Sequence, residues 1–401
     1  MPDKPGQAVV LALAAGAMIG MLNGFALGPF MPTISKDFDV SIPLLGQVVT
    51  ATFVGATAVC IFAGPLADMY GKRRVIILGL VSLTLSAFGT ALSADFGWLL
   101  ATRMISAISA GALAGTTLAM AGTLFDGDDR RRAMAWIASG IAAGGVVGIP
   151  VLTMIAEASS WRTSFGVIGL FGLVWILLTR RLLPDDAQQG GRIQPGKILA
   201  SYRPLIRDRL MLSFYSSTVL RSIGWVGTLT YIGAYLGDEL GLSTSEIGWA
   251  YMVGGGGYFI GTKLAGSRFI GVDLRTIYGA ATIAMGVFLA LSISLPFGTI
   301  PVVGLLALAG ISGGFGWVAL VTLVSTSSPA GQGTTMSLNA AMFQIGSALG
   351  GLSGGLLLAF GGYATLGLGL MGFAFLAVSL VWRPSRTAIL GRSPGPATAA
   401  D

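Results

Sequence analysis

The sequence predicts an all-α membrane protein in which twelve transmembrane helices form two six-helix bundles. Composition, a series of apolar windows and an internal repeat support this prediction. Apolar residues make up 54% of the 401-residue chain and charged residues only 10%, with a mean hydropathy of +0.80. Soluble domains carry about 25% charged residues, so a soluble core is excluded. Glycine accounts for 61 residues, which suits helices that pack closely in lipid.

Apolar windows of about 20 residues mark helices that can cross a bilayer. The first window is too long for the apolar region of a signal peptide and lacks a small-residue cleavage site, so we interpret it as the first span. The single cysteine, Cys60, can form no intrachain disulfide. We expect spans at residues 8–31, 43–67, 74–93, 97–124, 132–156, 163–182, 210–236, 246–267, 275–295, 299–325, 333–360 and 363–382.

The longest polar stretch falls at the midpoint of the chain, between the sixth and seventh spans. We interpret it as a linker between two bundles. The predicted organisation is an N-terminal bundle at 1–183, a cytoplasmic linker at 184–209, a C-terminal bundle at 210–383 and a cytoplasmic tail at 384–401.

The basic residues predict the orientation. If the N-terminus is cytoplasmic, all but four of the 24 lysines and arginines lie on the cytoplasmic side. The exceptions are Lys36 and Arg162 outside, and Arg103 and Arg221 within spans. The positive-inside rule therefore places both termini in the cytoplasm, in a multi-pass protein of the cytoplasmic (inner) membrane. Topology and contact with anionic lipid explain the net charge of +7, so we expect no nucleic-acid partner.

The two halves align when one is shifted by 202 residues. Parallel six-helix repeats are a transporter architecture in which the substrate site lies between the halves near the membrane midplane. Site-forming groups are expected where the halves differ at central positions: Asn23 falls on Trp225, and Ile19 falls on Arg221. The alignment places Gly55 on Gly257, Arg73 on Arg275, Met134 on Met336, Gly144 on Gly346 and Gly148 on Gly350.

A polar loop motif follows the second span. Gly64 is small enough for a neighbouring helix to approach, and Gly71 permits a tight turn. Asp68 can interact with a helix N-terminus, and the basic residues can pair with acids at the end of the fourth span, such as Asp126. We predict that this cluster is a gate that holds the two bundles together on one face; the alternative is a simple positive-inside turn. The motif reads Gly64-Pro65-Leu66-Ala67-Asp68-Met69-Tyr70-Gly71-Lys72-Arg73-Arg74.

This loop closely resembles the signature loop of the major facilitator superfamily, and the twelve spans, the linker and a degenerate copy at residues 266–275 extend the resemblance over the whole chain. The resemblance implies a secondary transporter that works by alternating access. Further motifs resemble the drug:proton antiporter and arabinose (sugar) efflux permease group. These are Gly28-Pro29-Phe30-Met31-Pro32; Arg103 with Gly111; the helix-packing residues Gly140, Gly144, Gly148 and Pro150; and Trp161-Arg162 with Phe165.

Three departures from that group weaken the case for proton-driven export of cationic drugs. Met69 stands where the loop carries arginine, and Ile149 separates Gly148 from Pro150, which are adjacent in the group's motif. Asn23 stands in the first span, where many multidrug antiporters carry an acid.

Three cations lie inside predicted spans with no acid or histidine beside them: Arg103, Arg221 and Lys263. Ionisable residues within a membrane cost about 2.5–3.5 kcal/mol each, so they are candidates for function. Arg103 either takes part in coupling or ties the first span to the fourth through backbone carbonyls. Arg221 suits a carboxylate, sulfonate or phosphate because guanidinium presents a fixed fork of donors. Lys263 is close enough to the cytoplasmic end to reach the headgroups.

Other polar and aromatic residues at mid-depth complete the candidate substrate or coupling site: Asn23, Trp225, Asn339 and Gln344. Each could equally bond one helix to another. No phosphate-binding loop, metal-ligand cluster or nucleophile–base pair occurs in the sequence. We therefore expect neither an enzyme nor a cofactor or metal.

The predicted function is secondary active transport of a small organic solute, with export as the expected direction and a coupling proton as a possible partner. The charge pattern favours an alternative, an organic-anion exchanger or facilitator that uses Arg221 and Arg103. A transporter-like sensor is a third alternative, although such sensors usually have large soluble extensions. We expect a monomer in the lipid bilayer.

Overall fold

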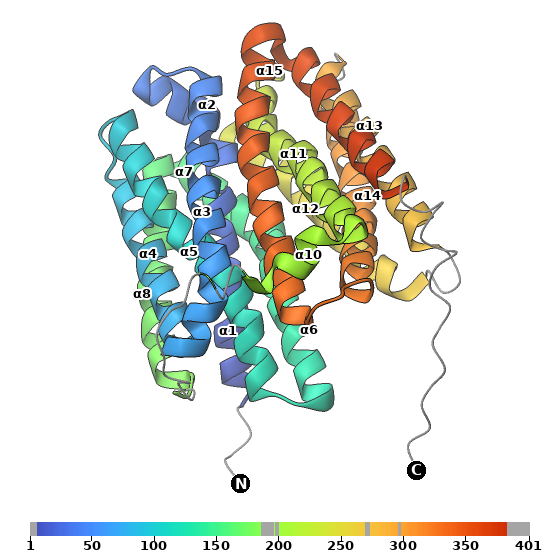
Figure 1. The fold of residues 1–401 in the computed structure, drawn as a ribbon. Helices are drawn as coiled ribbons and strands as arrows, with labels where there is room; N and C mark the ends of the chain where they lie inside the picture. The colour runs from blue at the N-terminus through green and yellow to red at the C-terminus, as the bar shows by residue number, and fades with distance from the viewer. Residues whose placement is uncertain (1–5, 186–195, 197–199, 269–272, 296–297, 383–401) are drawn as a thin grey trace, which may run out of the picture.

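The computed structural model describes residues 6–185, 196, 200–268, 273–295 and 298–382. The described residues form helices and connecting turns, without a strand (Figure 1). Half of the predicted linker, the tail and part of the degenerate loop copy lie outside the described residues, and the domain boundaries stay a prediction.

The first half of the chain supplies the helices up to residue 182. They are α1 (Gln7–Phe25), α2 (Leu27–Phe38), α3 (Ile42–Tyr70), α4 (Lys72–Ala91), α5 (Phe96–Leu124), α6 (Gly127–Ala143), the π-helical turn η1 (Gly144–Gly148), α7 (Ile149–Ala158) and α8 (Trp161–Leu182). The second half supplies α10 (Arg203–Arg207), α11 (Arg209–Asp238), α12 (Thr244–Arg268), α13 (Leu274–Ser294), α14 (Thr299–Thr326) and α15 (Gln332–Trp382).

These helices make twelve crossings within the described residues. Nine helical segments are long and apolar enough to cross a membrane, with α1–α2 and α6–α7 each acting as one segment. The 30-residue α11 and the 25-residue α12 are also long enough to cross a membrane, but they are more polar than the other nine segments. Helix α15 has non-helical dihedrals at Gly361 and Gly362 and so contains two crossings. The predicted all-α fold with twelve spans is confirmed.

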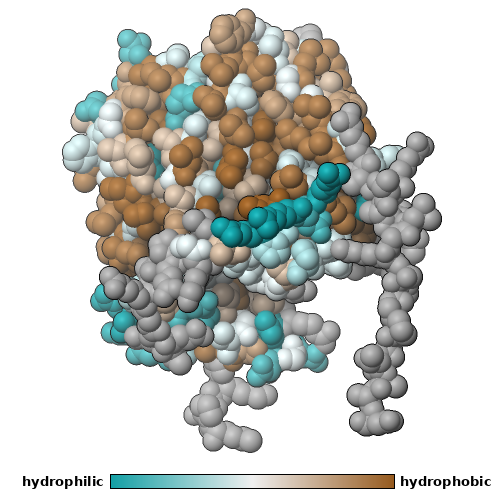
Figure 2. All heavy atoms as spheres, in the orientation of Figure 1, coloured by the Kyte–Doolittle hydropathy of each residue, from teal (hydrophilic) through white to brown (hydrophobic). Residues whose placement is uncertain are grey.

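The crossings alternate in direction, so the turns fall at two ends of the molecule. We call the end that holds the turns 39–41, 92–95, 159–160, 239–243 and 361–362 the far end, and the opposite end, where α1 begins, the near end (Figure 1). Figure 2 shows a largely hydrophobic middle on the visible face, with hydrophilic residues gathered towards the near end. This pattern fits a multi-pass membrane protein.

Glycines on α6 and η1 determine how closely the N-terminal bundle packs. A Cβ at Gly140 would collide with the carbonyl oxygen of Ala14 on α1, and one at Gly148 would lie 2.5 Å from Leu22. Gly144 lies between them, with the carbonyl oxygen of Met18 at 3.1 Å from its Cβ position. Pro150, two residues after Gly148, lacks a backbone N–H, which favours a wider π-helical turn before it. The three predicted packing glycines thus lie against α1, and Pro150 packs against Gly248 of α12 instead.

The two halves meet tightly towards the far end. Gly28 on α2 faces Gly233 on α11, so closely that a Cβ at Gly233 would collide with the Gly28 carbonyl. Gly351 on α15 approaches Gly46 on α3, whose carbonyl oxygen is 3.0 Å from the Gly351 Cβ position. On the other side of the interface, Gly248 on α12 packs against Thr153 and Pro150 of α7. We call these three contacts the far-end seam.

Candidate functional site

Arg103 and Asn23, two of the predicted site residues, lie together between α5 and α1. Arg103 is 1% exposed and donates to Asn23 Oδ1 at 3.1 Å and to the Asn23 backbone carbonyl. Its guanidinium lies 5.5 Å from the ring centroid of Phe165 on α8. Asn23 lies in the last turn of α1, where carbonyls lack helical partners and a cation is favourable. Arg103 therefore ties α1, α5 and α8 together.

Arg221 occupies a comparable position in the C-terminal half. It is 1% exposed and donates to the backbone carbonyl of Gly313, so it joins α11 to α14. Its guanidinium lies 5.7 Å from the ring of Trp317 on α14 and also beside Tyr258 on α12. Among the described residues, neither Arg221 nor Arg103 forms an ion pair with a carboxylate. Each half thus contains one buried guanidinium that bridges two helices through a carbonyl.

Aromatic rings surround Arg221. Trp225, one turn along α11, stacks against Tyr258 with ring centroids 5.2 Å apart, and Trp317 meets Phe343 of α15 at 5.7 Å. All four rings are partly exposed, whereas the side chains around Arg103, including Asn23, Thr52 and Phe165, are fully buried. The two buried arginines therefore differ in their neighbours, which are partly exposed rings at Arg221 and fully buried side chains at Arg103.

Three hydroxyl and guanidinium atoms around Arg221 have no hydrogen-bond partner although they are buried: Arg221 Nε, Ser222 Oγ and Thr282 Oγ1. A Cβ at Gly316 would lie 3.0 Å from Thr282 Oγ1 and 3.6 Å from Arg221 Nε. Thr282 Oγ1 and Arg221 Nε thus both lie next to Gly316, where no side chain separates them from the backbone. Unpaired buried polar groups are costly, so this position favours an additional polar partner.

The remaining candidates predicted from the sequence, Asn339, Gln344 and Lys263, have different surroundings. Asn339 on α15 is buried and accepts a hydrogen bond from Thr218 on α11 at 2.8 Å, so it links two helices of one half. Gln344 is 7% exposed and makes no hydrogen bond within the described part of the chain. Lys263 is exposed, with its Nζ 5.5 Å from the Phe259 ring centroid, as expected for a lysine that reaches the headgroups.

The loop motif lies at the near end, between α3 and α4. Gly71 has a φ of 92°, a conformation that favours glycine, and ends α3. Lys72 pairs with Asp68 at 3.9 Å within the motif. Arg73 pairs at 2.5 Å with Asp185, which follows α8, and donates to the backbone carbonyl of Arg180 in the last turn of α8.

Two expectations for this loop are not met in the structure. Asp126 lies before α6 without a side-chain hydrogen bond and forms no ion pair in the described residues, because Arg73 pairs with Asp185 instead. No atom lies within 4 Å of the Gly64 Cβ position, so the close helix approach expected there is not made in this conformation.

At the far end, Glu157 makes a polar contact between the halves. It lies in the last turn of α7, and its Oε2 accepts a hydrogen bond at 2.6 Å from the backbone N–H of Ser245 in the first turn of α12. A carboxylate near a helix N-terminus is favourable. Nearby within the N-terminal half, Asp37 pairs with Arg162 at 2.6 Å and accepts from Trp161 Nε1 at 2.7 Å. Glu157 thus connects the two bundles, and Asp37 connects α2 to α8.

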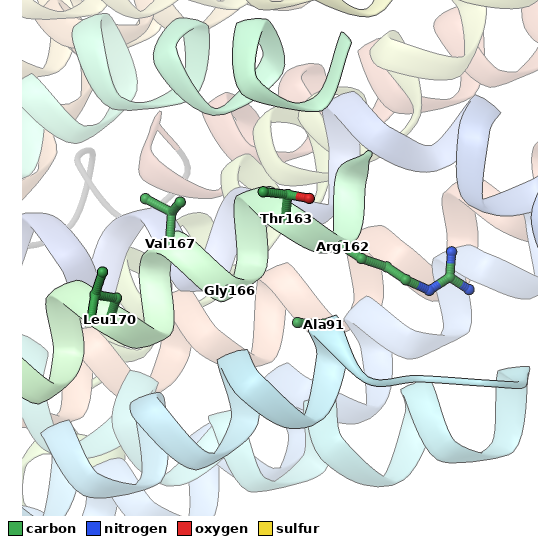
Figure 3. Close-up of a pocket in the computed structure, with 6 residues that line it drawn as sticks. All are labelled: Ala91, Arg162, Thr163, Gly166, Val167 and Leu170. Carbon is green, nitrogen blue, oxygen red and sulfur yellow. The ribbon is translucent and has the colours of Figure 1, made fainter. Parts of the chain in front are cut away.

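Two hollows in the described structure differ in place and size. One, of about 360 Å³, lies open on α4 and α8 at the far end, with Ala91, Gly166, Val167 and Leu170 along it and Arg162 directed away from them (Figure 3). It faces outwards from the N-terminal bundle and does not lie between the halves. The other, of about 20 Å³, lies inside the C-terminal half beside Trp225, Tyr251 and Gly254, and is large enough for a water molecule.

Two residues around Arg221, Tyr258 and Thr282, were not predicted from the sequence as site residues. Tyr258 follows the glycines of α12 on the same helix face as Tyr251, a signal that the seven-residue spacing could have provided. Thr282 lies on α13, where one threonine among many in apolar helices carries no distinguishing signal.

Comparisons with known proteins give the chain's relatives. The family profile described as the Major Facilitator Superfamily matches residues 13–272 and 214–397. The hexuronate transporter of Bacillus subtilis (strain 168) is 28% identical over 257 residues, which are 62% of this chain and 60% of that protein. The inner membrane transport protein YdhP of Escherichia coli (strain K12) is 26% identical over 381 residues, 92% of this chain and 94% of that protein. The riboflavin transporter RibZ of Clostridioides difficile (strain 630) is 26% identical over 48% of this chain and 42% of that protein.

The solved structures with a similar fold include a bacterial homologue of the human lysosomal transporter Spinster. Its inward-facing, occupied form has a TM-score of 0.76 and 17% sequence identity, covering 98% of this chain and 100% of the other. Its inward-facing, unoccupied form has a TM-score of 0.73 and 17% identity, covering 95% of each chain. At this identity the similarity shows the fold alone.

Proposed function

The chain belongs to the major facilitator superfamily, and on that premise we propose that it moves a small organic solute across the membrane by alternating access, as a secondary active exporter. The single observation that carries the proposal is the far-end seam. Bare glycine backbones from two pseudo-equivalent bundles pack against each other at one end. Such an interface can separate when the bundles rock about a central site.

The conformation supports an inward-facing assignment. With the N-terminus cytoplasmic, the far end faces outwards, and the seam closes the outer end of the path. The two similar solved structures are also inward-facing. In this assignment the pairing of Arg73 with Asp185, next to the linker, belongs to the inner gate together with Gly64, Asp68, Gly71 and Lys72.

Glu157 is the residue we propose to latch the outer end. The described spans contain no carboxylate at mid-depth, so conformational coupling through an acid falls to the helix ends. Of the three edge acids Asp68, Asp126 and Glu157, Glu157 has a hydrogen bond that crosses between the halves. Breaking this bond is part of outward opening.

An organic-anion exchanger or facilitator is the second candidate, and the buried guanidinium of Arg221 without a carboxylate partner favours it. The name of one relative, the hexuronate transporter, denotes an anionic sugar acid, and that of another, the riboflavin transporter, denotes a flat ring system. Both kinds of solute are compatible with the groups around Arg221.

Flux measurements in proteoliposomes test the proposal. Vesicles with the purified protein should release at least one loaded solute from panels of organic anions, neutral sugars and nucleosides, and lipophilic cations, faster than protein-free vesicles. Repeating the assay with an imposed pH gradient, with and without a protonophore, distinguishes proton-coupled export from exchange or facilitation. Binding without any net or exchange flux would instead identify a transporter-like sensor.

A further inference from the structure

We infer that the substrate of the proposed transport is a planar organic anion, of the aromatic carboxylate class, and that it binds the C-terminal half at Arg221. The inference rests on the proposed function and identifies the class of solute and the residues that recognise it. The cluster consists of Arg221, Trp225, Tyr258, Thr282 and Trp317, and we call it the Arg221 cluster.

Charge is the first argument. A guanidinium within a membrane is costly to bury, and no carboxylate in the described residues neutralises Arg221. A single backbone carbonyl, that of Gly313, accepts one of its N–H groups, while Nε remains without a partner. Guanidinium binds a carboxylate with two parallel hydrogen bonds where both donors are available.

Unpaired donors are the second argument. Arg221 Nε and Thr282 Oγ1 both approach the side of Gly316 where a side chain would otherwise stand, at 3.6 and 3.0 Å from its Cβ position. An oxygen of an anion next to this backbone can accept from both groups. Glycine at 316 keeps the approach open, because a Cβ there would press against the Thr282 hydroxyl.

The rings are the third argument. Trp225 stacks on Tyr258, Trp317 lies over the guanidinium, and all are partly exposed. Tyr258 belongs to α12, whose Gly255 approaches Gly145 of the other half at 3.6 Å from its Cβ position. Tyr258 and the Trp225 ring stacked on it therefore lie on or next to a helix that borders the interface between the halves, where flat apolar surfaces can stack on an aromatic solute.

A comparison of Arg221 with Arg103 assigns the anion to the C-terminal half. Arg103 has the same charge and burial, and its Nε likewise has no partner, but two of its other N–H groups bind Asn23, and the side chains of Asn23, Thr52 and Phe165 that surround it are fully buried. None of these neighbours of Arg103 is a partly exposed aromatic ring. Arg103 therefore acts as a clamp within its bundle, and Arg221 is the residue that meets the solute.

Matched small probes separate charge from shape. Benzoate, benzamide, benzylammonium and cyclohexanecarboxylate are titrated into the detergent-solubilised full chain, with thermal shift and quenching of tryptophan fluorescence as readouts. We expect saturable binding of benzoate, at least tenfold weaker binding of benzamide and benzylammonium, and severalfold weaker binding of cyclohexanecarboxylate. Equal responses to benzoate and benzamide would overturn the inference.

Variants connect this preference to the cluster. Arg221→Gln should abolish the preference for benzoate over benzamide, while the exposed Arg203→Gln on α10 should retain it. Should Arg221→Gln fail to fold, Thr282→Val provides the second test, because it removes the unpaired hydroxyl at almost constant shape. It should bind benzoate severalfold more weakly without a lower melting temperature. Preference retained in Arg221→Gln, or unchanged affinity in Thr282→Val, contradicts the assignment.

The failure of this inference is distinguishable from failure of the transport proposal. A protein that moves cations or sugars in vesicles but shows no preference for aromatic anions remains a transporter and loses only the substrate assignment. A protein that binds benzoate through Arg221 yet moves no solute in vesicles retains the site and loses the transport proposal.

Discussion

A buried guanidinium can hold a bundle together only if its donors are matched by acceptors at fixed positions. Two N–H groups of Arg103 meet this condition through the side-chain and backbone oxygens of Asn23, while its Nε has no partner. A lysine has one compact ammonium in place of a planar fork and cannot reproduce both bonds in the same geometry.

Arg103→Lys should therefore destabilise the protein by about 1.5–3 kcal/mol, the contribution of hydrogen bonds to charged groups. The measurement is the unfolding midpoint in detergent. Arg203→Lys, on the exposed surface of α10, is the matched control and should leave the midpoint unchanged. Equal midpoints for the two variants would mean that Arg103 is not a clamp.

At the residue scale, the sequence identified both buried arginines and Asn23 because a charge or amide in an apolar span is conspicuous. It could not distinguish their environments. Arg103 and Arg221 look alike in sequence, and only the packing of distant helices shows that buried side chains enclose one and partly exposed rings surround the other. Thr282 was not predicted because hydroxyls are ordinary in membrane helices, and Tyr258 was not predicted although its seven-residue spacing from Tyr251 was a usable signal.

Helices are the next scale, and the crossing of α2 with α11 is where small residues matter most. Gly28 and Gly233 bring two backbones into contact between the halves. Overpacking a close contact costs about 1–3 kcal/mol, and a difference of 1.4 kcal/mol is tenfold in an equilibrium constant.

Gly233→Ala should accordingly shift the far end towards the open state by about tenfold. The shift is measured by the distance between spin labels at Lys36→Cys on α2 and Glu239→Cys after α11, in a Cys60→Ala background. Gly24→Ala is the control, because no atom lies within 4 Å of its Cβ position. An unchanged distance distribution in Gly233→Ala would show that the seam does not limit opening.

Glu157 provides a polar test of the same interface. Glu157→Ala removes the acceptor for the Ser245 N–H, so the open population should rise. Glu157→Gln retains an oxygen acceptor without the charge and should lie between Glu157→Ala and the unmodified protein. The label pair at Lys36 and Glu239 reports both changes. Identical distributions in all three proteins would exclude Glu157 as a latch.

At the scale of the helices, the sequence predicted most helix ends to within several residues. Apolar windows located the spans, but helices such as α3 and α12 continue beyond them because helix ends in polar surroundings carry no hydropathy signal. The predicted first span ends at 31, whereas α2 runs to Phe38 with Pro29 and Pro32 near its start. The π-helical turn at 144–148 was not predicted, since its glycines signalled only close packing.

The whole molecule is organised by its repeat. Each half supplies one arginine that bridges two helices, yet the bridging side chain comes from α5 in one half and from α11 in the other. The repeat predicted the arrangement in two bundles. In our proposal the arginine of the N-terminal half has a structural role, and the arginine of the C-terminal half binds the substrate. The pairing of Arg73 with Asp185 could not be predicted, because it depends on where the chain runs after α8.

Alternating access is tested most directly by measuring the two ends of the molecule together. Spin labels at Lys36→Cys and Glu239→Cys report the far end, and labels at Thr123→Cys on α5 and Thr326→Cys on α14 report the near end, each pair in a Cys60→Ala background in lipid nanodiscs. Alternating access predicts that Gly233→Ala lengthens the far-end distance and shortens the near-end distance. If the far end opens while the near end stays fixed, or if both ends open together, the bundles do not rock about a central site and the transport mechanism proposed here is contradicted.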